Sequence, residues 1–397
     1  MSNLNQTPSG ERIHIGIFGR TNAGKSSIIN ALTNQNIAIV SNIKGTTTDP
    51  VLKAMELLPL GPVVIIDTPG LDDESELGKE RIKKAYQMLA KTDIAIVAVD
   101  SSSGITETEE KLIDELKSRS IPYITVYNKC DLAPIGNLKE SEIAVSALTG
   151  ENITELKEKI ATLVPEKEKR VLVGDLIDAG DIIVLVVPID EAAPKGRLIL
   201  PQQQTIRDIL DSGATAIVCK DTELKETLTK LSVKPRLVIT DSQVFKTVSE
   251  ILPTDIPLTS FSILFARYKG DLKTLVDGVK AIETLQDGDK VLIAEGCTHH
   301  RQCGDIGSVK IPRMLEKVTG KTPIYDFASG TEFAESADDY KLIIHCGGCM
   351  LSEAEMKSRL KSATSKNVPI VNYGVLLAHL TGILKRSLEP FSDINFQ

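Results

Sequence analysis

The sequence contains no tryptophan, only five histidines and six cysteines, and only 4% of its residues are aromatic. It has no apolar run near the roughly 20 residues that a membrane-spanning helix requires. Its formal net charge is −8, so it lacks the basic excess that is typical of nucleic-acid-binding proteins. The first residues also lack the basic and then apolar stretches of a secretory signal. These absences predict a cytoplasmic protein that has neither a membrane nor a nucleic acid as a partner.

A chain of 397 residues is too long for one ordinary hydrophobic core, and its strand and helix patterns form three successive sets. Strands that alternate with helices predict an α/β fold with mainly parallel sheets. We expect one domain over residues 1–168, a scaffold or dimerisation domain over 172–260, and a third domain over 261–397. The expected strands cover residues 13–19, 63–67, 94–100, 123–128, 142–147, 181–190, 214–221, 235–241, 290–296, 322–330, 341–349 and 368–374.

The first domain opens with a phosphate-binding pattern. Residues 19–26 read GRTNAGKS, which fits GxxxxGK[ST] between an expected strand and an expected helix. Backbone N–H groups of such a loop wrap the phosphates, and the helix N-terminus favours the anion. We expect Lys25 to neutralise the β- and γ-phosphate oxygens and Ser26 to bind Mg²⁺. The residues expected to contact the nucleotide here are Gly19, Asn22, Ala23, Gly24, Lys25, Ser26 and Ser27.

Three further motifs follow in the order that a GTP-binding domain requires. In DTPG, Asp67 can hold Mg²⁺ through water, and the N–H of Gly70 can sense the γ-phosphate. In NKCD, the Asp131 carboxylate can accept two N–H bonds from guanine, which adenine does not offer, so the motif selects GTP over ATP. The SAL motif at residues 146–148 supplies backbone contacts to the guanine oxygen. The residues expected around the base are Asn128, Lys129, Asp131, Ser146 and Ala147.

Together these motifs resemble the translation-factor-related class of P-loop GTPases. Residues 45–49, GTTTD, resemble the switch I segment of the tRNA-modification and Era-like GTPases. That resemblance makes Thr47 the Mg²⁺-binding threonine. Because residues 46–48 are all threonine, the neighbouring Thr46 and Thr48 remain open as alternatives. The catalytic residues expected from this resemblance are Lys25, Thr47, Asp67 and Gly70.

Two residues indicate how this GTPase achieves catalysis. Leu71 stands where Ras-like proteins carry a glutamine that orients water, and a leucine side chain cannot do so. Asn22 matches the asparagine that helps to bind K⁺ near the phosphates in the resembling subgroup. The alternative for Asn22 is a simple loop-capping residue. We therefore expect K⁺ as a cofactor beside Mg²⁺ and GTP or GDP.

The last third of the chain holds a second candidate site. Cysteines that cluster in a protein from a reducing compartment indicate metal binding before disulfides. Residues 346–349 form a CxxC motif with two glycines inside, and Cys297 ends another expected strand of the same sheet. Three cysteines with an open fourth position suit a [4Fe–4S] cluster, and three cysteines with one histidine suit zinc. The residues alone leave both metals open.

The pattern Cys297-x-His299 followed by His345-Cys346-x-x-Cys349, behind a GTPase domain, resembles the HydF family of GTPases that mature [FeFe]-hydrogenase. The resemblance covers the full chain and implies a homodimer whose Cys297, Cys346 and Cys349 bind a [4Fe–4S] cluster. Either motif histidine, a carboxylate or water then remains open as the fourth ligand.

The same resemblance also implies a role and a set of partners. The chain would receive a diiron cofactor precursor from radical-SAM maturases and deliver it to apo-[FeFe]-hydrogenase. The rival interpretation is a tRNA-modification or ribosome-assembly GTPase with a structural zinc site. Switch I and Asn22 favour this rival, whereas the acidic net charge opposes it.

Overall fold

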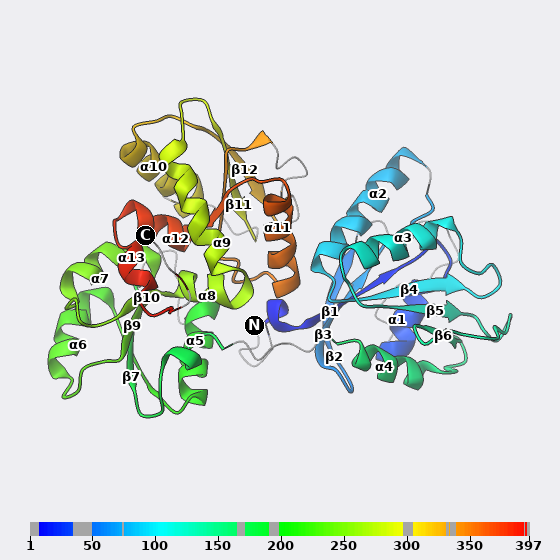
Figure 1. Ribbon diagram of the computed structural model, residues 1–397. Coiled ribbons are helices and arrows are strands. Elements are labelled where there is room, and N and C mark those ends of the chain that lie inside the picture. Colours follow the sequence, from blue (N-terminus) through cyan, green and yellow to red (C-terminus); the bar gives the residue numbers. More distant parts are fainter. Residues whose placement is uncertain are drawn as a thin grey trace. The chain divides into compact units, whose positions relative to one another are not determined.

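A computed structural model describes residues 8–34, 50–73, 75–164, 171–189, 198–296, 305–330, 333, 339–392 and 394. The chain forms two compact units, Met1–Lys167 and Glu168–Gln397 (Figure 1). Each unit buries its own apolar residues, so each has a separate hydrophobic core. Within the described ranges, no helix is long and apolar enough to cross a membrane.

The first unit is built on a sheet that has six strands in its described part, in the order β2-β3-β1-β4-β5-β6. Its strands are β1 (Ile13–Phe18), β2 (Val51–Leu57), β3 (Gly61–Asp67), β4 (Ile94–Asp100), β5 (Tyr123–Asn128) and β6 (Glu142–Val145). All neighbouring pairs are parallel except β2 with β3. The sequence predicts every strand but β2, whose residues are mostly exposed and therefore show no apolar run.

Helices cover both faces of this sheet. They are α1 (Lys25–Thr33), α2 (Glu76–Gln87), α3 (Glu107–Ser118) and α4 (Ile153–Thr162). Apolar residues of α1 and α4 pack with one face, and those of α2 and α3 pack with the other. This arrangement of three layers confirms the predicted α/β fold of the first unit.

The second unit contains two parallel sheets of four described strands each, in the orders β10-β9-β7-β8 and β12-β11-β13-β14. The first comprises β7 (Ile182–Val186), β8 (Thr215–Cys219), β9 (Leu237–Thr240) and β10 (Leu258–Ser260), and the second β11 (Lys290–Glu295), β12 (Ile324–Ser329), β13 (Leu342–His345) and β14 (Ile370–Asn372). Strand β10 ends at Ser260, where the sequence places the boundary between the second and third expected domains. The prediction of mainly parallel sheets is confirmed.

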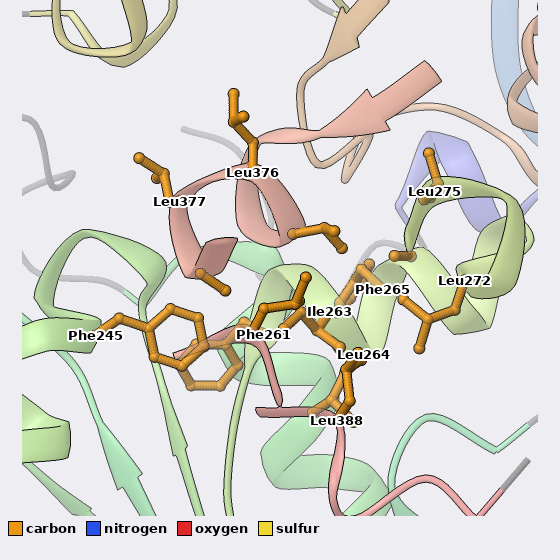
Figure 2. Packing of buried hydrophobic residues seen from close by; sticks show 14 of the residues in the cluster. Phe245, Phe261, Ile263, Leu264, Phe265, Leu272, Leu275, Leu376, Leu377 and Leu388 are labelled. Carbon is orange, nitrogen blue, oxygen red and sulfur yellow. The ribbon is translucent and has the colours of Figure 1, made fainter. Parts of the chain in front are cut away.

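Nine helices are described around these sheets. They are α5 (Leu200–Asp211), α6 (Leu224–Lys230), α7 (Phe245–Ile251), α8 (Phe261–Lys269), α9 (Leu272–Asp277), α10 (Ile311–Thr319), α11 (Glu353–Ser365), α12 (Tyr373–Leu380) and α13 (Leu384–Leu388). Figure 2 shows side chains of α7, α8, α9, α12 and α13 that pack together, including Phe245, Phe261 and Phe265. Both sheets contribute to this one apolar cluster. The division of residues 172–397 into two domains stays a prediction.

Candidate functional site

The phosphate-binding pattern forms a loop between β1 and α1. Gly24 precedes α1 with a φ of 87°, and a Cβ atom there would lie 2.0 Å from Nδ2 of Asn128. Only glycine combines this left-handed backbone with so close an approach. Lys25 begins α1, is 8% exposed and donates from Nζ to the carbonyl oxygens of Gly19 (3.0 Å) and Arg20 (2.8 Å). The ammonium group therefore lies inside the loop that is expected to wrap the phosphates.

Burial lowers the pKa of Lys25 to about 8, although Asp67, Asp72 and Glu109 oppose this shift. Asp67 ends β3, and its Oδ2 accepts a bond from Oγ of Ser26 at 3.4 Å. Its Oδ1 is buried and has no hydrogen-bond partner among the described residues. Burial raises the pKa of Asp67, and Lys25 partly offsets this effect. A buried carboxylate beside a serine hydroxyl fits Mg²⁺, which prefers oxygen ligands.

The segment after Asp67 is attached to the phosphate loop. The N–H of Leu71 donates to the carbonyl oxygen of Gly19 at 3.3 Å. Oδ1 of Asp72 accepts bonds from the N–H and the hydroxyl of Thr21, at 2.6 and 2.7 Å. These bonds hold the pKa of Asp72 below its usual value, although burial acts to raise it. Sequence reasoning missed Asp72, because its partner lies 51 residues away in the chain.

Arg20 and Asn22 occupy variable positions of the phosphate loop. The Arg20 guanidinium donates to Oε1 of Glu109 at 2.8 Å and to Oγ of Ser103 at 2.8 Å. Glu109 is fully buried and also caps α3 through Thr106. Arg20 is therefore bound to α3. Asn22 is exposed and has a left-handed φ of 64°.

One amide joins the phosphate and base motifs. Nδ2 of Asn128 donates to the carbonyl oxygen of Ala23 at 3.2 Å, and its Oδ1 accepts from the N–H of Ala147 at 3.0 Å. Lys129 has a φ of 68° and forms an ion pair with Asp100 at 2.6 Å. The fold thus brings together the loops at residues 19–26, 128–131 and 146–148. In the last two loops, Asp131 is exposed and Ser146 is buried.

The CxxC motif follows β13, whose neighbour in the sheet is β11. The N–H of Cys346 donates to the carbonyl oxygen of Ala294 at 2.9 Å, and the N–H of Gly296 donates to Sγ of Cys346 at 3.0 Å. Gly296, the residue before Cys297, therefore lies beside Cys346 at one edge of the sheet. Thr47, Cys297 and His299 themselves lie outside the described residues.

The loop between the two described cysteines turns at Gly348, which has a left-handed φ of 63°. Cys346 and Cys349 are both partly exposed. Burial raises the pKa of Cys349, and the nearby Lys269 opposes this shift. Lys269, which the sequence analysis did not identify, donates from Nζ to the carbonyl oxygen of Cys349 at 2.8 Å.

His345 is fully buried, and both of its ring nitrogens have partners. Nδ1 donates to the carbonyl oxygen of Cys346 at 2.6 Å, and Nε2 accepts from Nη1 of Arg359 at 2.9 Å. Burial, with the adjacent guanidinium, lowers the pKa of His345 to about 3, so the ring is neutral. Arg359 also binds Glu355 at 2.9 Å and the carbonyl oxygen of Gly330. In this arrangement His345 has no nitrogen left for a metal.

Thiol ligands on a glycine loop, with a backbone N–H directed at one sulfur, fit a metal that thiolates hold, whether zinc or an iron–sulfur cluster. Among the described residues, which exclude Cys297, no group of three His, Cys, Asp or Glu side chains is placed to hold a metal ion. The observed donor set is therefore a pair of cysteines at residues 346 and 349.

Three family models match successive parts of the chain. "50S ribosome-binding GTPase" matches residues 14–129. "Hydrogen maturase F dimerization domain" matches residues 172–270, and "Hydrogen maturase F tetramerization domain" matches residues 273–390. Most of each compact unit is thus covered by a match.

Individual relatives share the first unit. The tRNA modification GTPase MnmE of Legionella pneumophila (strain Corby) is 40% identical over 159 residues, which is 39% of this chain and 35% of that protein. MnmE of Aquifex aeolicus is 36% identical over 156 residues, 38% of this chain and 34% of that protein. The chain thus spans about a third of the length of these curated relatives. A crystal structure of Era from Aquifex aeolicus matches 52% of this chain and 92% of its own, with 21% identity and a TM-score of 0.35.

Proposed function

Since this chain belongs to the hydrogen maturase F (HydF) family of GTPases, we propose that it is a scaffold that carries a diiron precursor to apo-[FeFe]-hydrogenase. The proposal includes a [4Fe–4S] cluster held by Cys297, Cys346 and Cys349. It also includes radical-SAM maturases as the source of the precursor. The observation that carries the cluster is the bond from Gly296 to Sγ of Cys346, because Gly296 is the residue before Cys297.

In the first unit, the proposed site binds GTP with Mg²⁺. Lys25 would move its ammonium group from the loop carbonyls to the phosphate oxygens, and Ser26 and Asp67 would hold Mg²⁺, with Thr47 as the third residue. A bound Mg²⁺ neutralises charge on the phosphates. The Leu71 side chain is buried and carries no hydrogen-bonding atom, so it cannot orient a water molecule. We propose that Asn22 helps to hold K⁺, whose charge replaces that of an arginine finger.

In the second unit, a thiolate-bound [4Fe–4S] cluster supplies an iron with an exchangeable coordination position. We propose that His345 supports the cluster loop through Cys346 and is not the fourth ligand, because both of its ring nitrogens are bonded. His299, a carboxylate or water remain the alternatives. The rival role, in RNA modification, depends on the similarity to MnmE, and that similarity covers only 39% of this chain. The hydrogen maturase F models match the region beyond it.

Anaerobic reconstitution with iron and sulfide tests the cluster. We expect a brown protein with broad visible absorption and about four irons per chain. Cys297→Ser should lose most of this absorption, whereas Cys219→Ser, at a buried strand end, should keep it. A colourless protein that carries stoichiometric zinc would contradict the scaffold.

Exchange of the monovalent cation in the assay buffer tests the proposed role of Asn22. GTP turnover should be faster in K⁺ than in Na⁺ at equal ionic strength, and Asn22→Ala should remove the difference. Equal rates in both salts would reject the K⁺ site while leaving the cluster proposal intact.

The proposed homodimer forms through the first sheet of the second unit. Within the described structure, β8 is an edge strand of that sheet, and Val218 on it is 44% exposed. Leu210, on the preceding α5, is 57% exposed. An edge strand with exposed apolar side chains is suited to pairing with a second copy. The match to a dimerisation domain over residues 172–270 supports a dimer formed by this part of the chain.

A further inference from the structure

The last residue of α8 directs its side chain to the cysteine loop. Lys269 is only 3% exposed, although lysine is rarely buried in folded proteins. Its Nζ donates to the carbonyl oxygens of Cys349 and Leu351, both at 2.8 Å. These acceptors lie 80 and 82 residues further along the chain. One ammonium group therefore fixes the backbone at the end of the CxxC motif.

The packing around the end of α8 holds this ammonium group on the buried side of the cysteine loop. A Cβ atom on Gly270 would lie 3.1 Å from Cδ1 of Leu360 and 3.8 Å from Cγ of Met356, so the end of α8 lies against α11. Helix α11 begins directly after the loop, with Ser352 as its N-cap. Lys269 thus reaches the loop from the interior of the unit, with the Phe265 ring 5.6 Å from Nζ.

A buried ammonium group beside thiolates also acts through its charge. Lys269 is almost fully buried, and charges interact strongly where water is excluded. A [4Fe–4S] cluster on three thiolates carries one negative charge when oxidised and two when reduced. A nearby positive charge therefore stabilises the reduced form more than the oxidised form.

We infer that Lys269 is a positioning residue for the cysteine loop and that its ammonium group supplies positive charge to the cluster. The inference rests on the proposed function, since it takes the bound group to be a [4Fe–4S] cluster. It separates two roles: the hydrogen bonds order the loop, and the charge raises the reduction potential.

Two variants distinguish these roles in the reconstituted full-length protein. Lys269→Gln keeps a side-chain N–H donor and removes the charge, whereas Lys269→Met removes both. We expect Lys269→Gln to retain its iron and to shift the reduction equilibrium about tenfold towards the oxidised cluster, which is a potential about 59 mV more negative. Lys269→Met should also lose iron. Lys357→Gln, on the surface of α11, removes one charge from a side chain that is 54% exposed and should leave the potential unchanged.

Hydrogen exchange in the metal-free protein tests the positioning role without the cluster. Amides of residues 346–351 should exchange about tenfold faster in Lys269→Met than in the wild type, and at nearly the wild-type rate in Lys269→Gln. If the wild type binds no iron, the proposed function fails, yet this measurement still tests the loop. Unchanged exchange together with an unchanged potential would overturn the inference. So would a protein that folds only with lysine or arginine at position 269, because the charge would then serve the fold.

Discussion

At the residue scale, the phosphate loop holds Lys25 in a buried environment that disfavours its charged form. Lys25 is buried among protein atoms, and this burial lowers its pKa to about 8. Phosphate oxygens favour the charged form, so binding nucleotide raises this pKa. Protonated Lys25 binds phosphates best, and that form is lost from the free protein as the pH rises above about 8.

This leads to a prediction on pH. The affinity for GDP should be nearly constant below pH 7.5 and fall about tenfold between pH 7.5 and pH 9, since the free protein must then take up a proton to bind. Fluorescence titration with a labelled GDP measures this dependence. In Lys25→Met the affinity should be low and should lack the step near pH 8. A wild-type profile that is flat up to pH 9 would contradict the assigned role of Lys25.

Asp131 gives a second prediction at this scale. Its carboxylate is exposed and is predicted to accept bonds from guanine, and bonds to a charged acceptor contribute about 1.5–3 kcal/mol each. Asp131→Asn should therefore weaken GTP binding about 10- to 100-fold while changing ATP binding little. Glu140→Gln, at another exposed acid of the same unit, is the matched control. Unchanged GTP affinity in Asp131→Asn would show that the base is recognised elsewhere.

The sequence predicted residues whose chemistry is local and missed those whose partners are distant. GxxxxGK[ST] and NKCD are contiguous, so their residue types alone indicate phosphate and guanine. The bonds of Arg20 to Glu109 and of Lys269 to Cys349 span 89 and 80 residues. No short pattern encodes such pairs, because tertiary packing creates them.

At the scale of elements, buried strands were predicted and two strands at sheet edges were missed. Buried parallel strands such as β4 are continuous apolar runs and are easily read. Strand β2 is an exposed edge strand, and β10 has only three residues and follows two prolines within residues 253–257, so neither carries a readable period. A sheet predicted from sequence therefore most readily lacks such edge strands.

The edge strand β8 carries the prediction at this scale. If β8 forms the proposed dimer contact, Val218→Lys should convert the protein to a monomer, because a charge on an exposed edge opposes pairing. The free energy of unfolding should change by less than about 0.5 kcal/mol, as for most surface substitutions. Light scattering after size-exclusion chromatography measures the mass. Val233→Lys, at a site 59% exposed in the same unit, should leave the dimer intact. A Val218→Lys dimer of unchanged affinity would place the contact on another surface.

At the scale of the whole molecule, two units with separate cores predict two unfolding transitions. A ligand stabilises only the unit that binds it, by about 2.7 kcal/mol at a hundredfold excess over Kd. GDP with Mg²⁺ should therefore raise one calorimetric transition by about 5 °C or more and leave the other in place. Lys25→Ala should abolish this shift and retain the iron content of the cysteine loop. A joint shift of both transitions would contradict independent units.

The Asn128 amide also affects the entropy cost of nucleotide binding. Its bonds to Ala23 and Ala147 join the two halves of the site through the protein's own atoms. The conformational entropy of bringing these loops together is therefore lost during folding and not upon binding. An incoming nucleotide therefore meets phosphate and base loops that are already joined.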